Sequence, residues 1–474
     1  MSASNDTRRA FLQRLGRLSA AAGAARFGML PAFAAEPTNC AGPKTGTPIK
    51  WTPDTNPVLP RQPASTLGAA DVAKLRKAYA ALRALATTQP DDPRGWLQQG
   101  DKHCWNCGGG LDTQHGEEIH GSWLFFPWHR AYLYFHERIL GSLINDPSVR
   151  LAYWDWDNPA HRAIPAAWTT PNNASNPLWD ANRSAVAGNQ VPNSLVGPAI
   201  MNPINHAANF TKIGGSASAP GNLENGPHGG VHIWCGDTTL QSQSADMGLL
   251  DTAAQDPIFF AHHANIDRLW QVWVTSAASH RNPTSAAWLK HKFTFWDERK
   301  RWVSITPADV INMSTQLRYT YGTGAAALTT TLSAPTIHLL KIDAATRKLT
   351  VSDSVRKRVA DTTDARPKMM TLSVEGIVLP PEAKGIMRIV ANQPSATLEA
   401  VAGTPNDLGY IAIVPRTSKD THQHGALTVD LNVTEQLNTL LQENGTLSLS
   451  YVPMAGAART NRLNYKNASL LLHQ

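Results

Sequence analysis

Histidines set among aromatic residues are the feature of this sequence that could do chemistry. In the segment IHGSWLFFPWHRAYLYFHERI, His120 and His129 stand nine positions apart on either side of an aromatic run. An imidazole in such a dry wall is either a hydrogen-bonded core group or a neutral ligand whose lone pair binds a metal. A single histidine would favour the core group, so the metal hypothesis depends on partner histidines elsewhere.

Partner histidines occur in three other segments. His103 lies in HCWNC, and the neighbours His262 and His263 lie in DPIFFAHHANID. His228 and His232 are four positions apart, a spacing that puts both rings on one face of a helix. Two sets of imidazoles on different helices are therefore expected, and all-nitrogen ligation suits copper or zinc.

Four segments predict the helices that position these rings, because their apolar residues recur at intervals of three and four. They cover residues 71–88, 127–143, 228–234 and 256–277, with a loop region between about 155 and 225. Pro127 suits a first helical turn. Helices joined by long loops predict a mainly α catalytic domain built on a four-helix bundle, which can hold metals between facing side chains.

The character of the chain changes after about residue 288, where short β-branched runs alternate with turn residues. The runs are 293–296, 336–340, 371–378, 386–390, 410–414, 426–433 and 447–452. They predict a C-terminal all-β sandwich or barrel. The glycine-containing segment at 322–327 is the expected hinge, which gives domains at 35–323 and 324–474.

Composition excludes several classes of protein. A chain of 474 residues with 42% hydrophobic residues can bury a large core, and 15 tryptophans with only 17% charged residues indicate an enzyme interior. The net charge is +7, and five arginines against one aspartate before residue 35 account for four of these charges. The remainder carries no nucleic-acid signature.

Residues 1–34 have the order of a twin-arginine export signal. The pair Arg8-Arg9 is followed by a weakly apolar stretch and by the small residues Ala32-Phe33-Ala34. An amphipathic N-terminal helix is the alternative. The signal predicts a folded protein exported to the periplasm or the medium. No later apolar run approaches the ~20 residues that span a bilayer, so no membrane span is expected.

Two segments, HGSWLFFPWHRAYLYFHE and DPIFFAHHANID, resemble both copper signatures of the type-3 copper proteins. HCWNC, DDPRGWLQQ and PHGGVHIWCGD are most similar to the plant-type polyphenol oxidases, tyrosinase and catechol oxidase. Together with the export signal, the resemblance predicts a bacterial member of this family. It implies two copper ions, with dioxygen as co-substrate.

The resemblance implies a role for each histidine and for three cysteines. Copper A would be held by His103, His120 and His129, and copper B by His228, His232 and His263. His262 would not be a ligand, because the signature places the ligand four positions before Asp267. Cys107 would form a thioether with His120, and Cys104 a disulfide with Cys40.

The implied activity is the oxidation of o-diphenols (catechols) to o-quinones, with small phenols as substrates. Glu224 resembles a carboxylate that orders a water near copper A, which favours hydroxylation of monophenols. Gly229, however, stands where many monophenolases carry an asparagine, so we expect diphenolase activity and leave tyrosinase activity open. Leu250 stands where plant enzymes carry a phenylalanine over the copper, which predicts a wider entrance.

Three other functions fit parts of the pattern. Oxidation of o-aminophenols is open to the same site. A hemocyanin-like oxygen carrier uses the same histidines without turnover, but the exported single chain and the thioether candidate argue against it. A dinuclear zinc hydrolase usually mixes carboxylates with histidines, whereas these signatures supply only histidine.

The resemblance also covers two features outside the histidine segments. SVEGIVLPPEAKGIMRI resembles the family's C-terminal β-domain, which in relatives covers the copper site and keeps the enzyme latent, so residues 324–474 are an expected shield with an activating protease as partner. Arg61, Tyr319 and Tyr321 resemble a motif that closes the catalytic domain. A surface arginine and two strand aromatics are the alternative.

Overall fold

The computed structural model describes residues 46–107, 117–185, 187–236, 246–322, 332–363, 365–416, 425–441, 445–454 and 460–474. The expected export signal at 1–34, Cys40 and most of the expected hinge at 322–327 lie outside the described residues. Thr38–Gln474 make up one compact unit. Among the described residues, no helix combines the length and the apolar character needed to cross a membrane.

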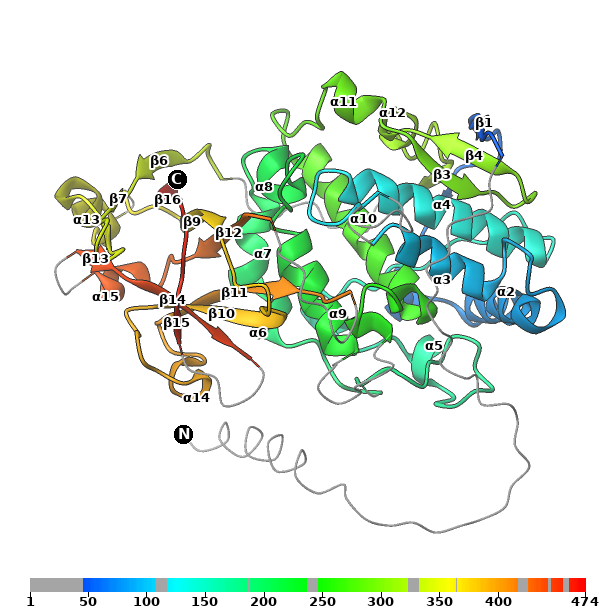
Figure 1. Cartoon of the computed structure of the whole chain (residues 1–474), viewed down its shortest axis with the longest axis horizontal. Helices are drawn as coiled ribbons and strands as arrows, with labels where there is room; N and C mark the ends of the chain where they lie inside the picture. Colours follow the sequence, from blue (N-terminus) through cyan, green and yellow to red (C-terminus); the bar gives the residue numbers. More distant parts are fainter. Residues whose placement is uncertain are drawn as a thin grey trace, which may run out of the picture. The chain divides into compact units, whose positions relative to one another are not determined.

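The helices that carry or flank the histidines are α2 (Ala69–Thr88), α3 (Trp96–Trp105), α4 (Phe125–Leu143), α9 (Gly229–Cys235) and α10 (Ile258–Ser276). Helices α4 and α10 are buried on nearly every face, as expected of central helices. Figure 1 shows them side by side, with α2 and α3 next to α4. Helices α2, α4, α9 and α10 begin and end within two residues of the four predicted segments.

Helix α3 was not predicted, although it carries His103. Its sequence WLQQGDKHCW is short and polar overall and contains Gly100, which lowers its helix propensity. The helix is instead held by burial of its polar side: Gln99, Lys102 and His103 are all buried. A Cβ at Gly100 would come within 3.1 Å of the Gln255 side chain, so glycine allows a close approach there.

The segment between 155 and 225 is not a plain loop. It contains four short helices, α5 (Ala166–Thr169), α6 (Asn193–Val196), α7 (Pro198–Asn205) and α8 (Phe210–Gly214). Their length explains why periodicity did not reveal them, because most of them make little more than one turn. The other short helices are α11 (Ala286–Leu289), α12 (Pro307–Val310), α13 (Asp353–Val359), α14 (Leu398–Val401) and α15 (Leu437–Leu440).

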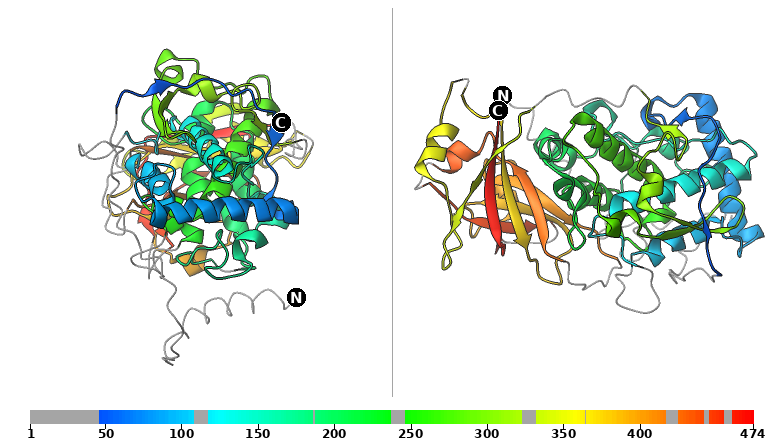
Figure 2. Two further views of the ribbon diagram at one scale, coloured as in Figure 1. Left: turned by 90° about the vertical axis from the view of Figure 1, so that its right-hand side faces the viewer. Right: turned by 90° about the horizontal axis from the view of Figure 1, so that it is seen from above.

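The described C-terminal residues form separate β-sheets, seen from two further sides in Figure 2. One four-stranded sheet has the order β11-β10-β14-β15 and another the order β12-β9-β16-β6. Their strands are β6 (Thr336–Leu339), β9 (Met369–Ile377), β10 (Gly385–Ala391), β11 (Asp407–Ile413), β12 (Leu427–Asn432), β14 (Leu449–Pro453), β15 (Asn461–Arg462) and β16 (Asn467–His473). Leu372 of one sheet and Ile389 of the other belong to the same hydrophobic cluster. A smaller sheet joins β7 (Lys341–Ile342), β8 (Leu349–Thr350) and β13 (Thr446–Leu447).

One predicted strand was assigned to the wrong region. The run 293–296 forms β3 (Phe293–Trp296), but it pairs with β4 (Trp302–Ile305), which also pairs with β1 (Ile49–Lys50), and not with the C-terminal sheets. Aromatic packing explains this position, because the Phe295 ring lies 5.2 Å from that of Phe135 on α4 and 5.4 Å from that of Trp128. A further pair joins β2 (Leu59–Pro60) to β5 (Tyr319–Thr320).

Candidate metal centre

Three imidazoles from separate segments meet beside α4. His103 lies in the last turn of α3, His129 in α4, and His120 in the segment that precedes α4. Their ring centroids are 5.2 Å (His103 to His120), 5.3 Å (His120 to His129) and 5.6 Å (His103 to His129) apart. The three rings therefore form a nearly equilateral group, which we call the first trio.

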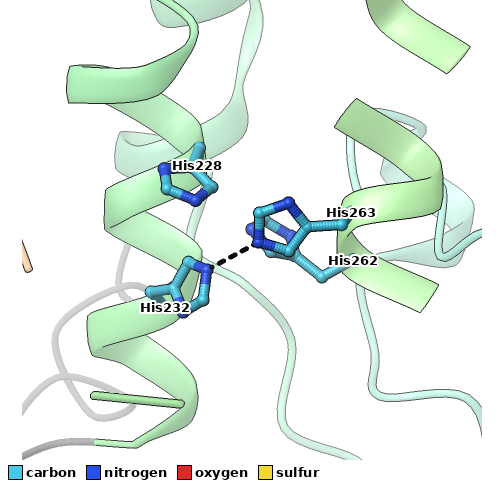
Figure 3. Close-up of side chains that lie close together, drawn as sticks. All are labelled: His228, His232, His262 and His263. Carbon is cyan, nitrogen blue, oxygen red and sulfur yellow. Dashed lines mark hydrogen bonds between the residues drawn. The ribbon is translucent and has the colours of Figure 1, made fainter. Parts of the chain in front are cut away.

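A second group faces the first from α9 and α10. The rings of His228, His232 and His263 lie between 4.6 and 5.3 Å apart, and we call them the second trio. The Nε2 atoms of His232 and His263 are 3.2 Å apart, as drawn in Figure 3. The His263 ring stacks on that of His129 at 4.1 Å, so the two trios adjoin.

Backbone carbonyls orient four of these six rings. Their Nδ1 atoms lie 2.8 to 3.1 Å from carbonyl oxygens, two of them one turn earlier in the chain (His129 with Phe125, His228 with Glu224) and two in more distant residues (His103 with Leu250, His232 with Met247). A carbonyl can only accept, so each Nδ1 carries the proton and each Nε2 keeps its lone pair. This is the arrangement in which a protein presents neutral imidazole to a metal.

Three of the six nitrogen atoms that would bind a metal are buried without another partner among the described residues. Among the described residues, the Nε2 atoms of His120, His129 and His228 are buried without a hydrogen bond. Burial is the largest cause that lowers the pKa of His103, His129, His228 and His263 well below the ordinary value, and neighbouring imidazoles lower it further. The pKa of His232 is lowered to about 3. These rings are therefore neutral at pH 7 and fit a metal that accepts nitrogen donors.

His262 lies with the second trio, but its lone pair is already engaged. Its nitrogen atoms lie within 4.8 Å of those of His228, His232 and His263, so distance alone would make it a ligand. The indole N–H of Trp156 donates to its Nδ1 at 3.0 Å, which in the neutral ring leaves the proton on Nε2. An Nε2–H has no lone pair to offer a metal, which supports the prediction that His262 is not a ligand, although its Nε2 is also buried without a partner among the described residues.

Glu224 is held by the segment that carries His120. Its Oε1 accepts a hydrogen bond from the backbone N–H of Gly121 at 2.6 Å, while its Oε2 is buried without a partner among the described residues. Burial raises the pKa of Glu224 well above the ordinary value, against the lowering effect of the Gly121 hydrogen bond. A free, desolvated carboxyl oxygen is able to order a water molecule or to hold a proton.

Cys107 and Leu250 both lie at the first trio. The Sγ of Cys107 is 3.4 Å from Nδ1 of His103, and this thiol groups with His103 and His120 as possible ligands. Cys107 is free, whereas Cys104 is disulfide-bonded and its expected partner Cys40 lies outside the described residues. Leu250 contacts the trio through its carbonyl oxygen, 2.9 Å from His103, a role that side-chain reasoning could not find.

Glycine residues at the start of α9 let strand β11 approach the second trio. A Cβ at Gly229 would lie 2.9 Å from the Cβ of Ala412, and one at Gly230 would lie 2.6 Å from the hydroxyl of Tyr410. Both distances are too short for real carbon contacts. Gly229 therefore has a packing role: an asparagine at this position would displace β11.

Arg61, Tyr319 and Tyr321 form a buried network away from the surface. The guanidinium carbon of Arg61 lies 3.7 Å above the Tyr319 ring, and its Nη1 donates to the Tyr321 hydroxyl at 3.1 Å. Both tyrosine hydroxyls donate to Asp267 on α10. The alternative of a surface arginine is therefore wrong, since Arg61 is only 1% exposed.

Asp246 begins the turn whose Met247 and Leu250 carbonyls orient His232 and His103. Its buried carboxyl group lies against that of Asp180. Burial raises the pKa of Asp246 well above the ordinary value and that of Asp180 to about 6, and the two side chains share a hydrogen bond. Both pKa values exceed those of aspartates in the unfolded chain, so proton binding by this pair stabilises the fold. This stabilisation is complete below pH ~4 and is lost as pH rises through about 6. The pair therefore destabilises the protein at pH 8.

We expect Asp246→Asn to raise the free energy of unfolding at pH 8 by about 1 kcal/mol, since only one ionisable group then remains. The gain should shrink toward pH 5, where the natural pair holds its proton. Thermal melting of both proteins from pH 5 to 8 measures this. Parallel melting curves over that range would contradict the shared proton.

Comparisons with known proteins agree with one another. The family described as the common central domain of tyrosinase matches residues 93–199 and 169–276, and the polyphenol oxidase middle domain matches 282–328. The chain is 36% identical to the chloroplastic latent polyphenol oxidase of Prunus armeniaca over 60% of this chain and 52% of that protein. The chain thus spans about half the length of the curated relatives that it matches first.

Solved structures are similar over more of the chain. Latent apple tyrosinase matches with a TM-score of 0.67 and 26% identity, over 89% of this chain and all of that one. The polyphenol oxidase of Grenache (Vitis vinifera) matches with a TM-score of 0.53 and 33% identity, over 61% of this chain and 92% of that one.

Proposed function

Because the chain belongs to the tyrosinase and polyphenol oxidase family, we propose that it is a copper oxidoreductase that oxidises o-diphenols to o-quinones with dioxygen. The observation that carries the proposal is the pair of adjoining trios of neutral imidazoles. The Nε2 atoms of His120, His129 and His228 are buried without another partner among the described residues, and the two trios adjoin where His263 stacks on His129. The same geometry without turnover would serve an oxygen carrier, so the proposal requires a test of catalysis.

The first trio would hold copper A and the second trio copper B. Copper bound there would supply the exchange of two electrons between catechol and dioxygen. Two catechols together would give up four electrons and four protons and become two o-quinones, while one dioxygen takes them and ends as two water molecules. The protein's own contribution is to fix the imidazoles by the carbonyls of Leu250, Phe125, Glu224 and Met247, and to exclude water with the aromatic wall.

Glu224 is the residue able to handle the substrate proton. Its Oε2 is free to accept a hydrogen bond from a water molecule or from a phenol hydroxyl. This favours monophenol hydroxylation as a second activity, whereas Gly229 lacks the side chain that would orient such a water. Diphenolase activity is therefore the main proposal.

We also propose the thioether between Cys107 and His120 and the disulfide between Cys40 and Cys104.

Metal content and turnover test the proposal together. Purified protein loaded with copper should hold two ions per chain and convert catechol to quinone faster than it converts tyramine. Zinc as the native metal would favour the hydrolase. Copper with oxygen binding but no quinone would favour a carrier, and equal rates on tyramine and catechol would show that Gly229 does not limit hydroxylation.

We propose that the C-terminal domain, residues 324–474, shields the metal site of the catalytic domain, residues 35–323. Support comes from β11, whose Tyr410 and Ala412 pack on the glycines of α9 beside His228. Both residues belong to the hydrophobic cluster of the helical region. Catechol is therefore expected to reach the site only when β11 moves.

We expect limited proteolysis between 323 and 331, followed by separation of the fragments, to raise turnover of catechol measured immediately afterward. A bulky catechol should gain more than a small one, because the shield blocks it more. The uncut protein carried through the same column is the control. Unchanged turnover on both substrates would remove the shielding role.

The export route belongs to the proposal as well. A twin-arginine signal cut after Ala34 and a bacterial origin remain predictions, since residues 1–45 lie outside the described residues. The relatives found by comparison are plant proteins named as chloroplastic. Determining the N-terminal residue of the mature protein and its compartment would decide between an export signal and a transit peptide.

A further inference from the structure

The segment that follows strand β11 contacts Leu250, the residue whose carbonyl orients His103 of the first trio. We call Val414–Arg416 the strap. The backbone N–H of Leu250 donates to the carbonyl of Pro415 at 2.9 Å, and that of Asp251 donates to the carbonyl of Arg416 at 3.2 Å. The Val414 side chain packs with Leu250 and with Cys107 in a small buried cluster. Two consecutive N–H groups, of Leu250 and Asp251, thus donate to two consecutive carbonyls of the strap.

The residue paired with the strap is the one that orients His103. The carbonyl oxygen of Leu250 lies 2.9 Å from the Nδ1 of His103. The N–H of the same residue is tied to Pro415. The strap holds the backbone N–H of Leu250, and the carbonyl of the same residue orients the imidazole of His103. The position of the strap therefore sets the direction of the His103 ring.

The strap reaches the second imidazole of the trio through an ion pair. The Nη2 of Arg416 donates to Oε2 of Glu118 at 2.8 Å. The other oxygen of Glu118 accepts from the backbone N–H of His120 at 2.9 Å and lies 3.2 Å from its Nδ1. One carboxylate therefore joins Arg416 to His120. A carboxylate that accepts from the ligand's second nitrogen holds the ring and its tautomer.

Three other trio members are oriented by carbonyls outside the strap. The third member of the first trio, His129, is oriented by the carbonyl of Phe125 in its own helix. His228 is oriented by Glu224, one turn earlier. His232 is oriented by Met247. The contacts of the strap's own residues thus lead to His103 and His120, both in the trio proposed for copper A.

We propose that the strap is a structural part of the copper A site, in which Arg416 and Glu118 are positioning residues for His120 and Pro415 supports the Leu250 carbonyl for His103. The inference rests on the proposed function. It gives the C-terminal region a second role: the region supplies part of the frame that retains one of the two coppers. Removal of the region should therefore raise turnover only while both ions stay bound.

Arg416→Gln tests this, with copper retention as the readout. Outer partners of metal ligands typically contribute about 10–100-fold in metal affinity. The copper-loaded variant, titrated with a chelator, should release one equivalent of copper at about 10-fold lower chelator concentration than the natural protein, and the second equivalent at the same concentration. Arg416→Lys keeps the charge opposite Glu118 and should recover most of the retention.

Glu118→Gln supplies the matched second variant. If Arg416 acts through Glu118, the double variant should lose no more affinity than Glu118→Gln alone. Arg138 and Glu298 form an ion pair of similar exposure at 3.2 Å in the helical region, so Arg138→Gln and Glu298→Gln are the controls and should retain both ions. Melting of the metal-free proteins shows whether any variant has lost its fold.

Each outcome has one meaning. If the natural protein binds no copper, the proposed function fails before the strap is tested. If it binds two ions and Arg416→Gln retains both equally well, the strap inference is overturned. Additive losses in the double variant would also overturn it, because Arg416 would then not act through Glu118. If Arg416→Gln does not fold, the comparison of Arg416→Lys with Glu118→Gln decides in the same way.

Discussion

Replacing His263 by glutamine is expected to abolish catechol oxidation, by more than about a thousandfold, because the reaction has no route without the metal pair. Copper content should fall with activity. His263 is the member of the second trio that stacks on His129 and faces Nε2 of His232 at 3.2 Å. Its loss leaves the second trio with two nitrogen donors, too few to hold a copper ion firmly.

The neighbouring His262 offers a matched control for this prediction. His262→Gln should retain both copper ions and a substantial part of the activity, since Trp156 already occupies the Nδ1 lone pair of His262. Metal analysis and catechol turnover of the two variants side by side make the measurement. If His262→Gln lost copper as fully as His263→Gln, the indole hydrogen bond would not decide ligation and all four clustered histidines would be candidates.

Replacing Arg61 by leucine is expected to lower the free energy of unfolding by about 3–5 kcal/mol, because it removes a buried cation that pairs with two buried carboxylates. Arg61 donates to Oε2 of Glu137 at 2.9 Å and lies 3.4 Å from Oδ2 of Asp267. It also stacks on the Tyr319 ring at 3.7 Å. A leucine restores none of these contacts, so the loss should be among the largest for a single residue.

Thermal melting measures this effect, with a drop of roughly 3–6 °C in Tm expected for a unit of this size. Arg299→Leu is the control, because the Arg299 side chain is 70% exposed and its replacement should change the free energy of unfolding by less than about 0.5 kcal/mol. A Tm for Arg61→Leu as high as that of the control would mean that Arg130 and Arg150, which also pair with these carboxylates, are sufficient alone.

The helices that could be predicted are those with a strong periodic pattern. Helices α2, α4, α9 and α10 show it because their apolar residues face a core at regular spacing. Helix α3 was missed because it is short and polar overall, and it buries glutamine, lysine and histidine against other elements. The position of β3 was also beyond reach, since a strand's run of aromatic residues does not reveal which sheet or helix it will contact.

The histidine pattern by itself determined which residues would gather. The spacing of His228 and His232 places both on one face because a helix turns every 3.6 residues, and the long signatures around His120 and His263 identified the family. These are local properties, written in neighbouring residues. They hold however the rest of the chain folds.

Only the tertiary structure decided how the rings are held and which of them are free to bind. The His262 lone pair is taken by Trp156, which lies 106 positions earlier, and His120 is tied through Glu118 to Arg416, 298 positions from that glutamate. His103 is oriented by the carbonyl of Leu250. Every residue has a carbonyl, so no sequence pattern marks the one that will accept. Contacts between distant segments exist only after the chain has brought them together, and they determine the protonation and direction of each imidazole.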